Sequence, residues 1–294
     1  MPDTDLVPVT YFPTPTHDLF RTNAGRIQAK PYARYFDGDM WLHRAALPAL
    51  RAPMDHRQAL GVDPAALNTL LDPDHHSVEN GFCLLPDGTA YVASLVPFPG
   101  ATGDMLQWWF WWFMVEHERY ILWDPYRRVA VSPSNREVLG RPGLTHEQRY
   151  VGNSIRGAEY VGANLVKVTT RFVAPESWGL DVTRFAAADI VAQVCGEIVL
   201  GGIQVGRMLR LAHRTADGFE LRSRFWLGDR FRLGARLDLE PVLRRTGLKR
   251  NVVDLTTAYE QLVGDQIGMT HLAGFLPAIY REFGTATEPA ESTR

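Results

Sequence analysis

Cysteine is scarce in this sequence, since Cys83 and Cys195 are the only two in 294 residues. Two cysteines are too few for a zinc ribbon or for the disulfide framework of a small secreted domain. The residues after Met1 contain neither a basic region nor an apolar run, so we expect no secretory signal. These features together predict a cytoplasmic protein.

An excess of charge of either sign is also lacking, because 31 Lys and Arg balance 33 Asp and Glu. A nucleic-acid partner, which is held by neutralising phosphates, is therefore not expected. Long apolar runs are missing too. The aromatic run 108–113 is far shorter than the roughly 20 residues of a membrane helix, so no membrane partner is expected.

What the sequence contains is enough apolar surface for a large core, with 46% hydrophobic residues. Residues 205–214 and 219–226 alternate in polarity around a turn at 215–218, which predicts a β-hairpin. Residues 257–282 have the periodicity of a helix, with Thr257 and Glu260 as a candidate capping box. The pattern predicts an α+β fold in which a long C-terminal helix closes the concave face of a curved antiparallel sheet.

The densest chemical signal is the aromatic segment 105–113, followed by 118–125. One interpretation is an amphipathic helix that buries its rings in the core. The other is a pocket for an aromatic or polyketide-like ligand, with Tyr120 offering its hydroxyl group to that ligand. On the second interpretation the candidate substrate-binding aromatic residues are Trp108, Trp112, Trp123 and Phe225.

Several motifs resemble the diacetylphloroglucinol hydrolase family, which includes phloretin hydrolase. They are PFPGATGDM at 97–105 leading into WWF at 108–110, RYILWDP at 119–125, YVG at 150–152, EYVG at 159–162, RSRFW at 222–226 and THLAGFLP at 270–277. The resemblance implies a helix-grip domain at 80–284 after a mostly helical N-terminal region at 1–79, and we expect a flexible tail at 285–294. It also implies a homodimer and zinc-dependent hydrolysis of a carbon–carbon bond between an acyl group and a phenolic ring.

In that family two His and two Glu hold the zinc ion. Arg128 stands in the place of the first His, and Glu159 matches the first Glu. The other two ligands are a His and a Glu four residues apart on the C-terminal helix, which fall on Gly264 and Gly268 in the preferred register. Later registers place the pair on Met269 and Ala273, or on His271 and Phe275. Because at least two ligands are absent in every register, we expect no metal and no cofactor.

The two helix glycines share one face, which indicates either close packing against the sheet or a pocket widened where a metal once sat. Arg128 would then supply a fixed positive charge and pair with Glu159. His213, on the first arm of the hairpin, is either a structural residue or an acid–base group. The predicted catalytic residues are therefore Tyr120, Arg128, Glu159 and His213.

Without a metal-activated water, hydrolysis is hard to catalyse. We therefore expect a metal-independent enzyme of specialised metabolism that cyclises, isomerises or joins by cycloaddition a small hydrophobic, oxygenated substrate. The first alternative is zinc-dependent carbon–carbon hydrolysis of acylated phenols. The second is a ligand-binding protein without catalysis, because one scaffold can serve both purposes.

Overall fold

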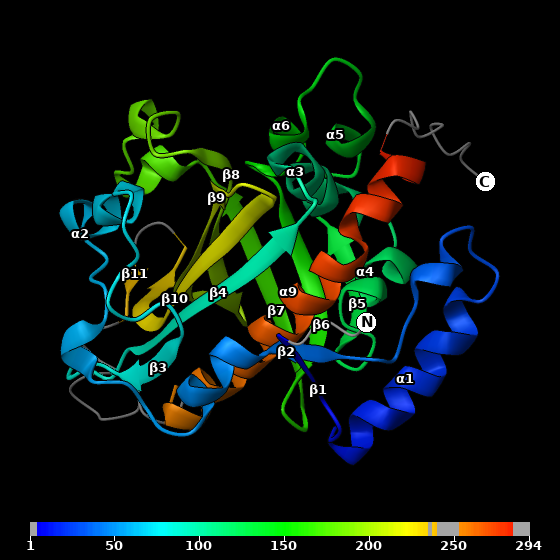
Figure 1. The fold of residues 1–294 in the computed structure, drawn as a ribbon, viewed down its shortest axis with the longest axis horizontal. Helices are drawn as coiled ribbons and strands as arrows, with labels where there is room; N and C mark the ends of the chain where they lie inside the picture. The colour runs from blue at the N-terminus through cyan, green and yellow to red at the C-terminus, as the bar shows by residue number, and fades with distance from the viewer. Residues whose placement is uncertain (1–4, 235–236, 240–252, 285–294) are drawn as a thin grey trace.

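The centre of the computed structural model, which describes residues 5–234, 237–239 and 253–284, is a nine-stranded antiparallel sheet. Figure 1 shows the strands crossing the molecule with a long helix packed against one face. In spatial order eight strands are β3 (Gly81–Leu84), β4 (Ala90–Pro99), β10 (Gly218–Leu233), β9 (Ile203–Arg214), β8 (Ile190–Leu200), β7 (Asn164–Val173), β6 (Ser154–Val161) and β5 (Arg128–Pro133). The ninth, β11 (Leu237–Asp238), pairs with β10.

The predicted hairpin is confirmed as β9 and β10, which pair from Phe219 opposite Arg214 to Leu227 opposite Gly206. Its alternation separates two faces of the sheet. Leu221 and Phe225 point into the main core, whereas Trp226 belongs to a second cluster on the opposite face. Because successive strand side chains point in opposite directions, the sequence pattern alone assigns each residue to its face.

The long helix is α9 (Leu255–Phe283), which runs along the inner face of the sheet against β3 and β4. Figure 1 shows it in orange and red. The helix begins earlier than predicted, so the expected capping box of Thr257 with Glu260 is wrong. Asp254 is the N-cap instead and accepts a hydrogen bond from the Thr257 amide at 2.7 Å. An aspartate cap satisfies an otherwise unpaired amide, and Thr257 completes a capping box from the N3 position.

The aromatic segment forms α3 (Gly103–Trp112), followed by α4 (His117–Trp123), α5 (Glu137–Gly140) and α6 (His146–Tyr150). The described part of the N-terminal region contains α1 (Thr14–Ile27), α2 (Pro64–Asn68) and the strand pair β1 (Leu6–Pro8) with β2 (Trp41–His43). The described ranges also contain six short 3-10 helices, at Ala33–Tyr35, Arg44–Leu50, His56–Gln58, Thr69–Leu71, Pro175–Trp178 and Val182–Arg184.

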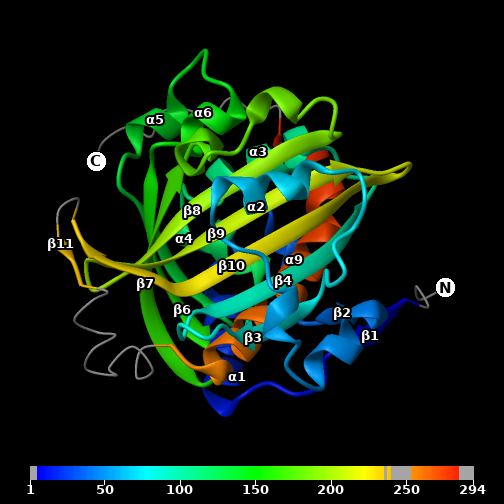
Figure 2. The same ribbon diagram turned by 90° about the vertical axis from the view of Figure 1, so that its left-hand side faces the viewer.

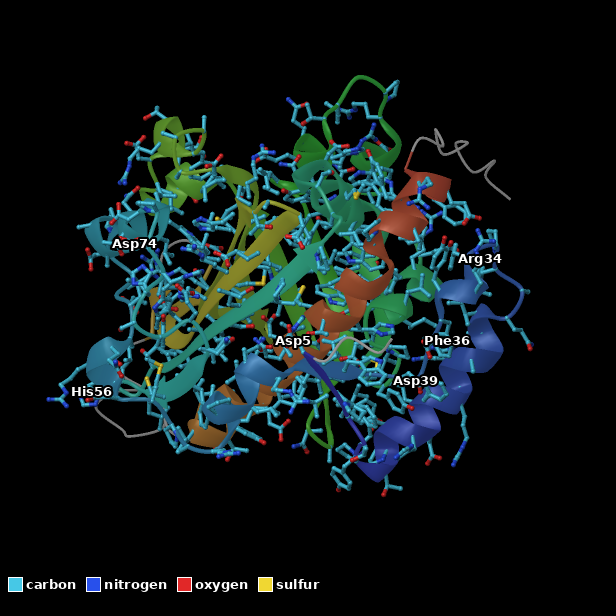
Figure 3. All side chains as sticks on the ribbon, viewed as in Figure 1. Asp5, Arg34, Phe36, Asp39, His56 and Asp74 are labelled. Carbon is cyan, nitrogen blue, oxygen red and sulfur yellow. The ribbon has the colours of Figure 1, made fainter. Side chains whose placement is uncertain are left out.

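The N-terminal region lies against two sides of the sheet. Figure 2 shows α2 over the sheet face that points away from α9. In Figure 3 the labelled Arg34 and Phe36 lie on the side of α1, whereas His56 and Asp74 lie on the other side of the molecule. Within the described ranges no helix is both long and apolar enough to cross a membrane. The predicted tail at 285–294 lies outside the described residues.

Candidate active site

A cavity of about 340 Å³ lies on the inner face of the sheet, between the strands, α4 and the first turns of α9. Most of its wall is apolar and is contributed by alternate residues of neighbouring strands. Representative lining residues are Ile155, Val168, Phe172, Ile198, Met208 and Phe225. Binding sites for small organic ligands have this character, with a few polar groups set into an apolar wall.

The polar groups gather where α4 meets β5 and β6. Tyr120 and Trp123 lie three residues apart on α4, so both point toward the same neighbours. Arg128 on β5 lies directly opposite Glu159 on β6 in the strand register. All four residues line the cavity. Two segments separated by about 30 residues are thus joined by the pairing of adjacent strands.

Arg128 is the centre of this cluster. Its Nη1 atom donates a hydrogen bond to the Tyr120 hydroxyl oxygen at 2.7 Å and forms an ion pair with Glu159. The guanidinium carbon also lies 4.4 Å from the ring centre of Trp123 and 5.0 Å from that of Tyr120. Burial lowers the pKa of Arg128 from its usual value. Arginine nevertheless stays protonated in proteins, so the cluster carries a fixed positive charge against one carboxylate.

A second polar group, which the sequence analysis did not include among the site residues, lies on the cavity wall. Arg210 of β9 lines the cavity and donates hydrogen bonds to Asp265 of α9 at 2.6 Å and to Ser223 of β10 at 2.7 Å. The side chains of Arg210 and Asp265 are only 4% and 1% exposed. Strand alternation could have identified Arg210 from the sequence, because it puts this charged residue on the same face as the apolar Met208.

The structure places Trp108 and Trp112 outside the cavity wall. Their rings stack on each other with centres 4.8 Å apart, and Trp108 also meets Tyr280 of α9 edge to face at 5.3 Å. Phe110 of the same helix and Phe113 directly after it line the cavity instead. Residues four apart share one helix face, so α3 gives one face to the core and another to the cavity.

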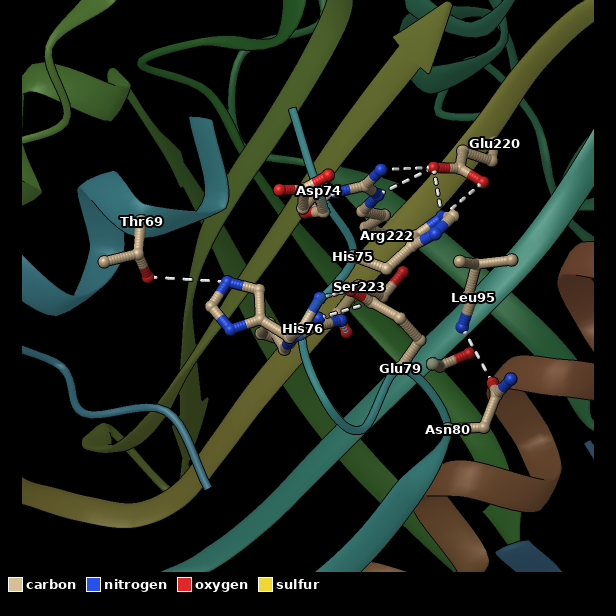
Figure 4. A network of polar contacts seen from close by, with 12 residues as sticks. Thr69, Asp74, His75, His76, Glu79, Asn80, Leu95, Glu220, Arg222 and Ser223 are labelled. Atoms are coloured by element: carbon tan, nitrogen blue, oxygen red, sulfur yellow. Dashed lines mark hydrogen bonds and ion pairs between the residues drawn. The ribbon is translucent and has the colours of Figure 1, made fainter. Parts of the chain in front are cut away.

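His213 lies on the sheet face that points away from α9, paired across the strands with Glu220. Figure 4 shows this region, where His75 and Arg222 both contact Glu220. His213 is only 5% exposed, and its burial lowers its pKa to about 4, with the neighbouring charge of Arg222 acting in the same direction. The structure therefore does not bring His213 together with Tyr120, Arg128 and Glu159.

Gly264 and Gly268 do not line the main cavity. Gly264 borders a smaller cavity of about 80 Å³ together with Arg127. A Cβ atom on Gly268 would lie 3.3 Å from the indole nitrogen of Trp123. In the structure, the α9 residues on the cavity wall are Thr257 and Gln261, and Asp265 follows one turn later in contact with Arg210.

The residues around the cavity do not fit the zinc ion that the family resemblance implies. A structural or catalytic zinc site needs at least three protein ligands. Glu159 is occupied by Arg128, and Asp265 is occupied by Arg210. Throughout the part of the chain that the structure describes, no three His, Cys, Asp or Glu side chains are grouped to hold a metal ion.

Comparison with known proteins shows that this chain is similar in sequence to proteins named as hydrolases. Residues 62–281 match the DAPG hydrolase PhiG domain. The chain is 36% identical over 288 residues to 2,4-diacetylphloroglucinol hydrolase of Pseudomonas protegens, covering 96% of this chain and 94% of that protein. A second 2,4-diacetylphloroglucinol hydrolase, from Pseudomonas sp, is 35% identical over 96% of this chain and 98% of that protein. Phloretin hydrolase of Eubacterium ramulus is 30% identical over 51% of this chain and 54% of that protein.

These relatives show that the expected reaction class was wrong. Cyclisation, cycloaddition or isomerisation followed from the loss of zinc ligands, whereas the matched proteins are named as hydrolases. The error has a physical origin. A change in the metal ligands alters how a carbonyl group and a water molecule are activated, but the shape of the pocket still determines which bond is presented to them. The first alternative of the sequence analysis predicted a hydrolase, and the names of the matched proteins agree with that prediction.

Proposed function

The chain belongs to the DAPG hydrolase family, and on that basis we propose that it hydrolyses the carbon–carbon bond between an acyl group and a phenolic ring. The observation that carries the proposal is the cluster of Tyr120, Arg128 and Glu159 at one end of an apolar cavity. Such a cavity can hold an aromatic ring while the polar end reaches the acyl carbonyl group.

The reaction adds one water molecule across the bond that is broken. The water oxygen attacks the acyl carbonyl carbon and gives a proton to Glu159, which acts as the general base. Arg128 and the Tyr120 hydroxyl donate hydrogen bonds to the carbonyl oxygen as negative charge develops there. The bond from the acyl carbon to the ring then breaks as the ring carbon takes up the proton that Glu159 received from water. The products are a carboxylic acid and the deacylated phenol.

The size of the cavity supports an aromatic substrate. An engineered cavity of about 150 Å³ is enough to hold benzene in another protein, and about 340 Å³ leaves room for ring substituents as well. Trp123 and Phe225 contribute aromatic surface to the wall. We propose that these two rings contact the phenolic ring, while Trp108 and Trp112 act through core packing.

The proposal is tested by incubating the purified full chain with 2,4-diacetylphloroglucinol and, separately, with phloretin. We expect chromatography to detect a carboxylic acid and a deacylated phenol in equal amounts. Tyr120→Phe removes one carbonyl donor and should lower kcat by about 100-fold. Tyr11→Phe is the matched control, because Tyr11 is 79% exposed. A cyclised product, or binding of both compounds without turnover, would contradict the proposal.

The arrangement of sheet and helix supports a finer description of the fold. We propose that it is a helix-grip, because α9 runs along the inner face of the antiparallel sheet and helps to enclose the cavity. The homodimer implied by the resemblance stays a prediction, which sedimentation velocity of the purified chain tests.

A further inference from the structure

We propose that this chain works without a divalent metal ion, and that guanidinium groups supply the positive charge at its active site. The role of the guanidinium groups in the reaction rests on the proposed function. The lack of a metal ion is inferred from the arrangement of charges alone. Two arginine–carboxylate pairs are present, Arg128 with Glu159 and Arg210 with Asp265. Arg128, Glu159 and Arg210 line the same cavity.

The first pair occupies Glu159, the metal ligand that the resemblance carries over in every register of the C-terminal helix. Glu159 faces Arg128 across neighbouring strands, and the two side chains are 16% and 14% exposed. The Arg128 guanidinium is held in place by the rings of Tyr120 and Trp123 and by its hydrogen bond to the Tyr120 hydroxyl. A metal ion at Glu159 would have to displace this guanidinium, or else lie beside its positive charge.

The second pair lies where α9 approaches the cavity. Gln261 lines the cavity, and Asp265 lies four residues later, so both project from the same side of the helix. This is the spacing expected of a ligand pair, but Gln261 offers only a neutral amide. Asp265 is neutralised by Arg210, whose second contact is the Ser223 hydroxyl.

The charges of these two pairs already balance, with two guanidinium groups against two carboxylates. Buried carboxylates are normally compensated either by an ion pair or by a metal ion. Since each carboxylate here has its arginine, a divalent cation would add two uncompensated positive charges to an apolar cavity.

Arg128 can take over the electrostatic task of a metal ion in the proposed hydrolysis. Its guanidinium group keeps its charge at any physiological pH and offers planar N–H donors to a carbonyl oxygen. With the Tyr120 hydroxyl, it stabilises the negative charge that forms when water adds to the acyl group. As in the hydrolysis described above, Glu159 accepts the proton from water, and the reaction needs no oxidant or reductant.

The first test is the metal content of the purified full chain by inductively coupled plasma mass spectrometry. We expect far less than one zinc per chain, and no change in Tm when a chelator or ZnCl2 is added. One zinc per chain, or a Tm that falls with chelator and recovers with zinc, would overturn the inference. This result stands apart from the proposed function, because it requires no substrate.

The second test uses Arg128→Ala, with Arg141→Ala as the control at an exposed arginine. We expect the first variant to lose turnover of 2,4-diacetylphloroglucinol and to regain part of it when guanidinium chloride is added at concentrations that leave the protein folded. Added zinc should restore nothing. A folded Arg128→Ala variant that zinc reactivates and guanidinium does not would overturn the role of Arg128. If the wild type hydrolyses neither 2,4-diacetylphloroglucinol nor phloretin, the proposed function is wrong. The metal content of the purified chain still decides whether the chain works without a divalent metal ion.

Discussion

The guanidinium group of Arg127 fills the space beside Gly264 where any other residue would place its Cβ atom. Arg127 Nε donates a hydrogen bond to the Tyr160 carbonyl oxygen at 2.9 Å and lies 3.9 Å from a carboxylate oxygen of Asp124. Burial raises the pKa of Asp124, and the charges of Arg127 and Arg128 oppose that rise. Gly264 thus leaves room for an arginine that packs against α9 and hydrogen-bonds to β6.

The first prediction compares two glycines of the same helix. Gly264→Ala should lower the free energy of unfolding by about 1–3 kcal/mol, because Arg127 must leave a partly buried hydrogen bond to make room. Gly274→Ala, where a Cβ atom meets nothing within 4 Å, should instead raise it by about 0.5–1 kcal/mol through helix propensity. Urea unfolding measures both. Equal effects at the two positions would show that Arg127 does not constrain residue 264.

The second prediction concerns the position of the Tyr120 hydroxyl. A Cβ atom on Gly157 would lie 3.1 Å from the Tyr120 hydroxyl oxygen, a tight contact that must push the phenol away by a few tenths of an ångström. We expect Gly157→Ala to lower kcat by about tenfold, because small displacements of a positioned group are costly to catalysis. Its Tm should stay close to that of the wild type.

Gly140→Ala is the control for this substitution, since nothing lies within 4 Å of its added Cβ atom. Steady-state kinetics with 2,4-diacetylphloroglucinol compare the two variants. Unchanged kcat in a folded Gly157→Ala variant would argue that Tyr120 does not contact the reacting atoms.

A third prediction addresses the buried pair of Arg210 and Asp265. Arg210→Met alone leaves a buried carboxylate without its partner and should cost about 3–5 kcal/mol of stability. The double variant Arg210→Met with Asp265→Leu removes both charges and should recover most of that loss. As a control, Arg21→Met in the exposed pair with Asp18 should change stability by less than about 1 kcal/mol. A double variant as unstable as the single one would show that the charges are not the cause.

The fourth prediction is a pH dependence that comes from His213. Its pKa is lowered from 6.5 to about 4, first by burial and then by the charge of Arg222, while Glu220 and Glu79 oppose this shift and Arg224 adds to it. Well above pH 6.5 the imidazole is neutral in both the folded and the unfolded chain. As the pH falls toward 4, the unfolded chain takes up a proton that the folded chain does not, so stability decreases.

His213→Asn should therefore reduce the slope of unfolding free energy against pH between 6.5 and 4 by about 1 kcal/mol per pH unit. Part of the slope should remain, because the pKa of buried His271 is also lowered to about 4. Chemical unfolding at several pH values gives the slope, with His56→Asn as a control at an exposed histidine. An unchanged slope in His213→Asn would show that His213 takes up its proton equally in both states.

The hairpin of β9 and β10 could be predicted because local periodicity determines it, whereas a helix was one of two interpretations of the aromatic segment that forms α3. Alternation places the neighbours Phe225 and Trp226 on opposite faces of a strand, and the structure has Phe225 in the main core and Trp226 in the second cluster. The start of α9 was placed too late, because aspartate at position 254 outside the apolar pattern caps the helix. Element boundaries depend on single capping contacts, which periodicity does not report.

The sequence by itself determined the sheet-and-helix architecture and the family, since both follow from local patterns and motifs along the chain. Only the tertiary structure decided which polar groups share a cavity. Arg128 meets Glu159 because β5 pairs with β6, and Arg210 meets Asp265 because its side chain extends from the inner face of β9 to α9. His213 lies three residues after Arg210 on β9, and an odd spacing along a strand places the two side chains on opposite faces of the sheet. Contacts between distant segments depend on strand register and helix placement, which no local pattern fixes.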